Sequence, residues 1–182
     1  MAASDVFDSR LKLSARRAYE RGRLEGALVR GAAAALLATP GFLFCISYTP
    51  WAAFCLTGFG LVVAAGRVRG GVFEEGSRAG AVAGILPCLL PAALRAIDPE
   101  LCMMLFSNGL EICGIGGAAA GIILGLRGRL SGGLAFWAPA LAAFGFAGSL
   151  GCLPSGAVGF VGLGLGLLIG AAPTLAWRRA HV

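Results

Sequence analysis

Residues 156–177 read GAVGFVGLGLGLLIGAAPTLAW, an uncharged stretch that two arginines follow directly. A helix needs about 20 apolar residues to cross the hydrocarbon core of a bilayer, which is roughly 30 Å thick. Gly162, Gly166 and Gly170 recur at every fourth position in this stretch, and such spacing gives one helical face small residues only. The stretch therefore predicts a membrane-spanning helix with one face suited to close packing.

The rest of the chain has the same character. With 58% hydrophobic and 13% charged residues and a mean hydropathy of +0.83, it has too few polar side chains to cover a soluble domain. Short links at 48–50 and 153–155 indicate antiparallel neighbours. We therefore expect an all-α integral membrane protein with six transmembrane helices in three hairpins. The expected spans are residues 31–47, 50–66, 79–94, 101–126, 134–151 and 156–177.

The basic residues predict the orientation of these spans. Fourteen of the fifteen Lys and Arg residues lie in residues 1–30 and after the second, fourth and sixth apolar stretches, and the exception is Arg95. Short loops rich in Lys and Arg stay on the cytoplasmic side. Both termini are therefore expected in the cytoplasm, with residues 31–182 as the transmembrane bundle.

Residues 1–30 are expected to form a basic cytoplasmic helix. This segment is too charged for a cleaved signal peptide, so we expect it to remain on the mature protein. The Arg-over-Lys bias and the many Ala and Gly residues indicate coding by GC-rich DNA. This is consistent with a bacterial protein, and we expect the bacterial inner membrane as its location.

Two interpretations of residues 9–30 stay open. Small and apolar residues, among them Leu11 and Tyr19, recur there at three- and four-residue spacing, and the arginines mostly fall elsewhere. The segment is either a flank that sets orientation and touches anionic lipid headgroups, or a docking helix for a cytoplasmic protein. Nucleic-acid binding is not expected, because no recognition motif accompanies the basic residues.

A second stripe of glycines lies in the fourth apolar segment, at Gly117, Gly121 and Gly125. Each stripe predicts a close-packed helix face, because small residues let two backbones approach closely. The two stripes meet either within one chain or between the chains of a homo-oligomer.

Glu111 is the one charged residue within the predicted spans. Its position places it roughly 15 Å deep in the membrane, where an acid costs at least ~2.5 kcal/mol and is expected to face the protein interior. Ser107 and Asn108 precede it on the same helical face. Glu111 is either a protonated glutamate that hydrogen-bonds within the bundle or an ion or proton site.

The six cysteines are unevenly placed in this topology. Cys113 falls near the middle of the membrane, and Cys102 with Cys152 is the first candidate for a disulfide, because both lie at outer helix ends. Buried thiols that pack as small apolar groups are the alternative. Without a Cys-x-x-Cys pair, and with His181 as the only histidine, no metal or cofactor site is predicted. The thiols expected toward the outer face are Cys45, Cys55, Cys88, Cys102 and Cys152.

An enzyme is the least favoured class, and no catalytic residue is predicted. The predicted spans contain no histidine to act as a base for a serine nucleophile, and a single acid makes no acid–base pair. The favoured class is a membrane-embedded regulator or sensor. The alternative is a small transporter or channel subunit that uses Glu111 as its ion or proton site.

Six short-linked spans with one charged cytoplasmic segment resemble the plan of the six-span inner-membrane anti-sigma factors of bacteria. The resemblance covers the topology, the helix at residues 9–30 and outward-placed cysteines such as Cys88 and Cys152. It implies that the N-terminal segment holds a sigma factor until an exterior signal acts on the membrane part, and that outer cysteines sense this signal. The contact residues that it implies are Leu11, Tyr19, Leu24 and Leu28.

Overall fold

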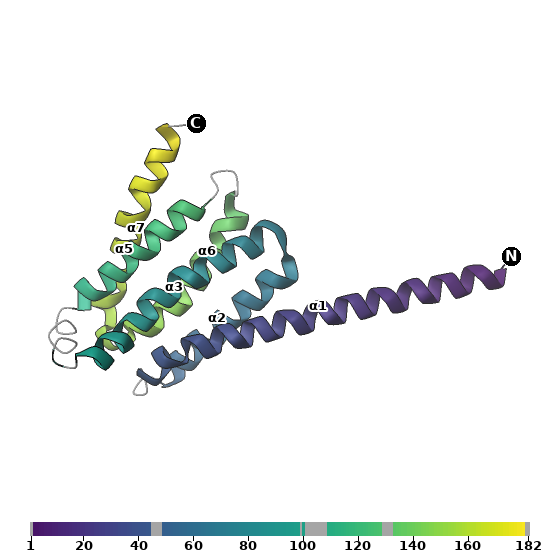
Figure 1. The fold of residues 1–182 in the computed structure, drawn as a ribbon, viewed down its shortest axis with the longest axis horizontal. Helices are drawn as coiled ribbons and strands as arrows, with labels where there is room; N and C mark the ends of the chain where they lie inside the picture. The colour runs from purple at the N-terminus through teal and green to yellow at the C-terminus, as the bar shows by residue number, and fades with distance from the viewer. Residues whose placement is uncertain (1, 45–48, 99, 101–108, 129–132, 181–182) are drawn as a thin grey trace.

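The computed structural model describes residues 2–44, 49–98, 100, 109–128 and 133–180, and all its elements are helical (Figure 1). The long helices are each at least 19 residues in length, and a short 3-10 turn, η2, joins the last two. In chain order they are α1 (Ala2–Phe44), α2 (Thr49–Arg69), α3 (Gly71–Ile97), α5 (Gly109–Arg127), α6 (Gly133–Cys152), η2 (Leu153–Ser155) and α7 (Gly156–Ala180).

Four of these helices contain stretches long and apolar enough to cross a membrane. They are Pro50–Arg69, Gly109–Arg127, Gly133–Cys152 and Gly156–Thr174. Large apolar side chains such as Leu168 and Ile169 of α7 lie exposed on them, as expected where lipid is the solvent. The expectation of an all-α membrane protein is confirmed at this level.

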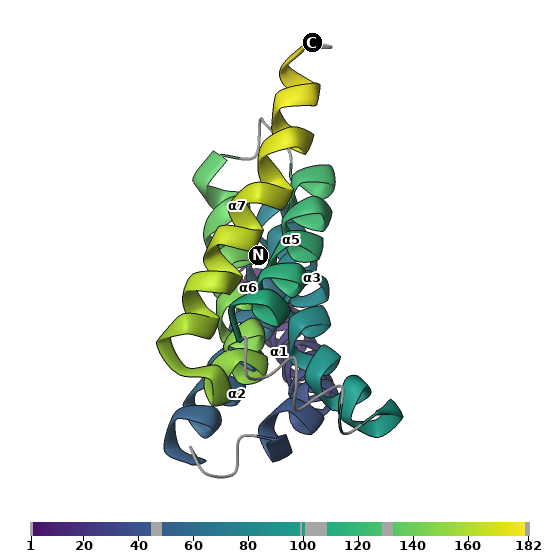
Figure 2. The same cartoon turned by 90° about the vertical axis from the view of Figure 1, so that its left-hand side faces the viewer.

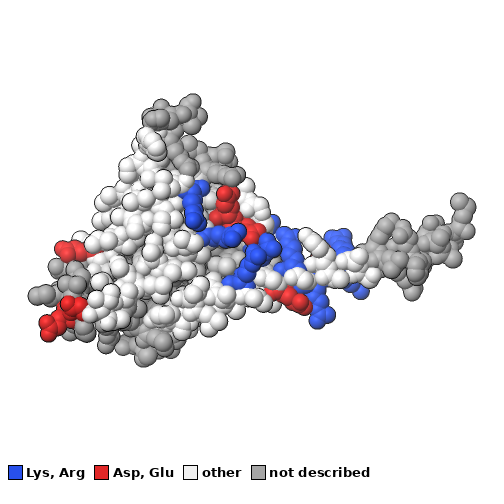
Figure 3. Space-filling model, in the orientation of Figure 1, with Lys and Arg blue, Asp and Glu red and all other residues white. Residues whose placement is uncertain are grey.

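The helices run alternately up and down the bundle (Figures 1 and 2). The end of α2, the start of α3, the end of α5 and the start of α6 lie at the end from which the N-terminal part of α1 projects. Figure 3 shows that most of the charged side chains visible on this face gather there, around the point where α1 leaves the bundle. We call this the basic end; Arg67, Arg69, Arg78 and Arg127 are the arginines outside α1 whose side chains are described there.

Helix pairing does not follow the chain order that the three predicted hairpins require. The most extensive contacts join α5 to α7 and α3 to α6, whereas α6 and α7, linked by η2 alone, touch only slightly. Of the expected hairpin pairs, only α1 with α2 is among the three most extensive contacts. The α5–α7 and α3–α6 pairs are parallel, because residue numbers increase in the same direction along both helices at their contacts. A short link restricts where a helix starts, but the glycine faces decide which helix it packs against.

The two predicted glycine stripes meet each other within one chain, between α5 and α7. A Cβ added at Gly121 would lie 2.8 Å from the backbone N of Ala171, and one at Gly166 would lie 2.8 Å from the backbone N of Ala118. Real Cβ atoms essentially never approach so closely, so only glycine fits at this helix separation. The predicted close-packed faces are confirmed. Of the two alternatives, contact within one chain or between chains, the structure has the contact within one chain.

A third glycine stripe, which the sequence analysis missed, holds α3 against α6. A Cβ at Gly80 would lie 2.7 Å from the carbonyl carbon of Ala140, and one at Gly84 would lie 2.7 Å from the Cβ of Ala147. The buried Pro87 continues this contact, since a Cβ at Gly151 of α6 would lie 2.9 Å from its carbonyl carbon. A Cβ at Gly116 of α5 would lie 2.8 Å from the Cβ of Pro87. Pro87 therefore lies where α3 packs closely against both α5 and α6.

Helix α1 is continuous from Ala2 to Phe44, so the N-terminal segment runs directly into the first apolar stretch. Its second half packs on α2, where a Cβ at Gly31 would lie 2.7 Å from the carbonyl O of Gly60. Its first half extends away from the bundle (Figure 1), and every side chain from Ser14 to Glu25 is exposed. The chain thus presents a bare helix beside a packed bundle.

Candidate functional site

Glu111 does not face the protein interior, contrary to the expectation from its sequence position. The described part of α5 begins at Gly109, so Glu111 lies in its first turn and is exposed. The inward positions of that turn are taken by the buried Ile112 and Cys113. An acid in a first turn is favoured by the helix dipole, which accounts for its presence there. Ser107 and Asn108, its predicted partners, lie outside the described residues.

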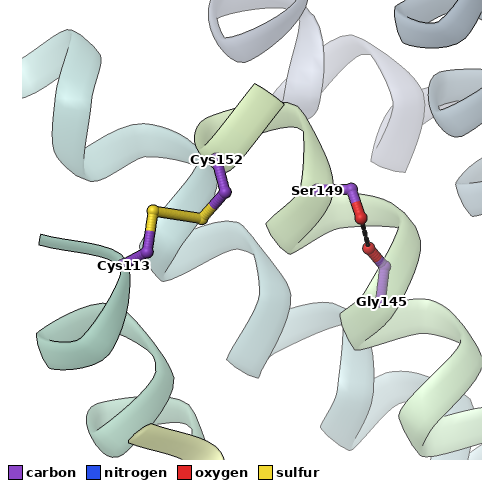
Figure 4. Close-up of a disulfide and its surroundings, with 4 residues drawn as sticks. All are labelled: Cys113, Gly145, Ser149 and Cys152. Atoms are coloured by element: carbon purple, nitrogen blue, oxygen red, sulfur yellow. Dashed lines mark hydrogen bonds between the residues drawn. A yellow bond between two sulfur atoms is a disulfide. The ribbon is translucent and has the colours of Figure 1, made fainter. Parts of the chain in front are cut away.

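The structure pairs Cys152 with Cys113 in a disulfide, with the two Cα atoms 6.1 Å apart (Figure 4). The expected pairing of Cys152 with Cys102 is therefore wrong. Cys113 lies one turn into α5, at the level where α6 ends, and not at mid-depth as its place in a longer span implied. Both cysteines are buried, and their bond ties α5 to the end of α6.

The other described thiols make different contacts. The buried Cys88 donates a hydrogen bond from its Sγ to the carbonyl O of Ala38, 3.9 Å away, which joins α3 to α1. Cys55 is half-buried and carries a free thiol. Cys45 and Cys102 lie outside the described residues.

Cys55 lines an apolar groove of about 840 Å³ between α2, α6 and the start of α7. Aromatic rings form much of its wall, and the ring centroids of Phe54 and Phe146 are 5.8 Å apart in an edge-to-face arrangement. Ser149 also lines it, but its hydroxyl donates a hydrogen bond to the carbonyl O of Gly145 (Figure 4). The groove lies between three helices that contain membrane-length apolar stretches.

The projecting part of α1 is stabilised from within. The Nε of Arg16 lies 2.9 Å from Oε1 of Glu20, and the Nε of Arg21 lies 3.1 Å from Oε1 of Glu25. Exposed pairs at this spacing each contribute about 0.3–0.5 kcal/mol to a helix. They favour the helical state of this segment modestly.

The predicted contact residues of this segment are exposed but do not share one face. Tyr19 is 70% exposed, Leu24 53% and Leu28 57%. Successive residues of a helix are about 100° apart, so Leu24 and Leu28 lie on nearly the same side of α1. Tyr19 lies on another side, next to Gly22. Leu28 borders the packed region, because it lines a shallow groove between α1 and α2. The side chain of Leu11, the fourth predicted contact, lies outside the described residues.

A glutamate holds three helices together at the basic end. Glu74, at the start of α3, places Oε1 3.3 Å from Nη1 of Arg30 in α1 and 3.2 Å from Nη1 of Arg67 in α2. The guanidinium of Arg23 also donates a hydrogen bond to the carbonyl O of Val68. The glutamate side chain is 17% exposed, so this link is partly shielded from water. From sequence these arginines were expected only to set the orientation; their contacts between helices depend on the fold.

Three places are candidate binding sites: the bare half of α1, the apolar groove and the basic end. The first was expected from sequence, and the other two arise from residues on separate helices, which no local pattern connects. No family model, no curated protein and no solved structure matches this chain.

Proposed function

We propose that this protein is a regulator in the bacterial inner membrane that binds a cytoplasmic protein through the N-terminal half of α1. The observation that carries the proposal is the continuity of α1: a bare, ion-paired helix joined without a break to a helix packed in the bundle. A partner bound to the first half is thereby coupled mechanically to the membrane part. The proposal includes six membrane crossings with both termini in the cytoplasm.

The partner that fits this helix is a protein with an acidic surface and a small apolar pocket. Exposed arginines outnumber the two glutamates on residues 14–25, and Arg17 makes no ion pair with any described residue. Tyr19 offers a large ring that is 70% exposed, with an apolar body and a polar tip. A sigma factor, which the plan of the anti-sigma factors implies, is one protein to test first.

The competing interpretation is that this half of α1 lies on anionic lipid. Its small and apolar positions, such as Ala15, Gly22 and Gly26, offer little to insert between headgroups, which favours a protein partner. The transporter alternative has weaker support, since Glu111 lies exposed in the first turn of α5 and lines a shallow groove between α5 and α7.

The test is photo-crosslinking in cells with the full chain. A photoreactive phenylalanine replaces Tyr19, and the control carries it at Leu36, which is 71% exposed on the bundle half of α1. We expect the probe at position 19 to give one discrete protein adduct and the probe at position 36 to label lipid. Because the partner is acidic, adding Arg17→Glu should remove most of the adduct. Lipid adducts alone at position 19, or the same protein at both positions, would refute the proposal.

A further inference from the structure

We propose that the basic end of the bundle contains a binding site for a phosphate group, formed by Arg67, Arg78 and Arg127. These arginines come from α2, α3 and α5, and all three line one polar hollow of about 690 Å³. Ligand pockets in proteins usually measure about 300–1,000 Å³, so the hollow accommodates a phosphate together with part of the molecule that carries it.

Two of these arginines lack an acidic partner in the structure. Arg78 and Arg127 are exposed and form no ion pair with any residue that the structure describes. Arg67, by contrast, is bound to Glu74 through Nη1, 3.2 Å from each carboxylate oxygen. The hollow therefore has one arginine fixed in place and two whose guanidinium groups remain available to a ligand.

The acids in the hollow do not cancel this charge. Glu74 and Glu75 also line it, but the carboxylate of Glu74 is shared between Arg67 and Arg30. Three arginines against two glutamates leave the lining of the hollow positive. An anion is thus the ligand class that the charge selects.

Arginine favours phosphate among anions, because its planar guanidinium matches two phosphate oxygens with two parallel N–H donors. Gly71 at the start of α3 borders the same hollow, and the N-cap of that helix has no side-chain hydrogen bond. The first backbone N–H groups of α3 add a weak positive potential on the same side. Arginines are common at the cytoplasmic edge of a membrane, where they set the orientation of the helices. Setting the orientation does not require arginines of three helices to line one hollow.

The phosphate can belong to a lipid headgroup or to a soluble molecule. The hollow lies at the water-facing edge if α2 and α5 cross the membrane, since Arg67 and Arg127 fall in their last turns. That level is where headgroup phosphates lie. The site is independent of the proposed docking helix, because no residue of α1 lines it.

The experiment measures binding to the purified full chain in detergent. One arm titrates short-chain phosphatidic acid, with phosphatidylcholine of the same chain length for comparison, and the other titrates inorganic phosphate. The variants are Arg78→Gln and Arg127→Gln, and the matched control is Arg69→Gln. Arg69 lies near the hollow but stacks on Phe73, with its Cζ 4.7 Å from the ring centroid, and it does not line the hollow.

We expect each hollow variant to weaken binding roughly tenfold and Arg69→Gln to change it less than twofold, because a hydrogen bond to a charged group is lost only in the former. Arg78→Lys keeps the charge but loses the paired donors, so it should fall between wild type and Arg78→Gln. Preference for phosphatidic acid over inorganic phosphate identifies a lipid headgroup, and the reverse identifies a soluble ligand; both support the site.

Two outcomes overturn the proposal. The first is that neither probe binds the wild-type protein. The second is that Arg69→Gln weakens binding as much as Arg78→Gln, which would mean that overall charge and not the hollow attracts the anion. The variants remain interpretable because both side chains are exposed, and unchanged helical circular dichroism shows that each is folded.

Discussion

The Cys113–Cys152 bond is the residue-scale feature with the largest expected effect on stability. It closes a loop of 39 residues and joins α5, packed on α7, to α6, packed on α3. Both sulfurs are buried, so the bond is shielded from reductants in the folded state. It connects the two parallel helix pairs at the end of the bundle opposite the basic end.

Breaking this bond should destabilise the bundle measurably. Cys113→Ala is expected to lower the free energy of unfolding by about 2–4 kcal/mol, because the unfolded chain regains the freedom that the closed loop removes. Cys55→Ala, which removes a free thiol at the groove, is the control and should cost less. Thermal unfolding in detergent measures both. Alkylation of the denatured, unreduced protein should leave Cys113 and Cys152 unmodified, and modification of either would contradict the pairing.

Single residues also show where prediction from sequence fails. The presence of Glu111 in an apolar stretch was plain from sequence, but its depth depended on where its helix starts. A start at residue 101 puts Glu111 inside the membrane, whereas in the structure it lies two residues after Gly109, the first described residue of α5. The same shift carries Cys113 to the level of Cys152. Hydropathy gives no boundary in this part of the sequence, because residues 101–108 are mostly apolar as well.

At the scale of helices, glycine spacing predicts which face packs but not against which helix. The stripe of Gly117, Gly121 and Gly125 was recognised, and its contact with α7 required the structure. The stripe of Gly80 and Gly84 was missed because it begins among charged residues at the start of α3. The short link between α6 and α7 suggested that these two helices pack together, but η2 joins them at one end only and they touch only slightly.

Two glycines of α7 provide a matched test of this packing. Gly166→Ala should reduce stability by about 1–3 kcal/mol, because its Cβ would overlap α5 and force the helices apart. Gly164→Ala should leave stability unchanged or raise it by up to about 1 kcal/mol, since a Cβ there meets nothing within 4 Å and alanine favours the helix. Thermal unfolding in detergent compares the two, and equal effects would contradict the α5–α7 contact.

For the whole molecule, the alternating helix directions agree with the charge distribution. Arg67, Arg69, Arg78 and Arg127 lie at the basic end, whereas Asp98, Glu100 and Glu111 lie near the other ends of α3 and α5. Arg95, near the end of α3, is the exception among the arginines. Short basic loops resist transfer across the membrane, so this asymmetry predicts the basic end in the cytoplasm. Composition was sufficient to predict an all-helical membrane protein, because so apolar a chain can satisfy its backbone only in helices or a closed barrel.

Reporter fusions test this orientation directly. A fluorescent protein that folds only in the cytoplasm should be active when fused after Val182, and a phosphatase active only outside should be silent there. Inserted at Ser155, between α6 and α7, the two reporters should give the opposite result. Equal activity of either reporter at both places would contradict six crossings with both ends inside.

The parallel pairing also has a consequence for synthesis. The partner of α5 is α7 and the partner of α3 is α6, so each glycine face is made well before the helix that covers it. Chains lengthen at about 5–20 residues per second, so these faces wait for a time of the order of seconds. During that interval α3 and α5 can associate with another nascent chain through the same faces. A ribosome stall before α7 would therefore leave a fragment prone to mispairing, and membrane chaperones or proteases would be expected to recognise it.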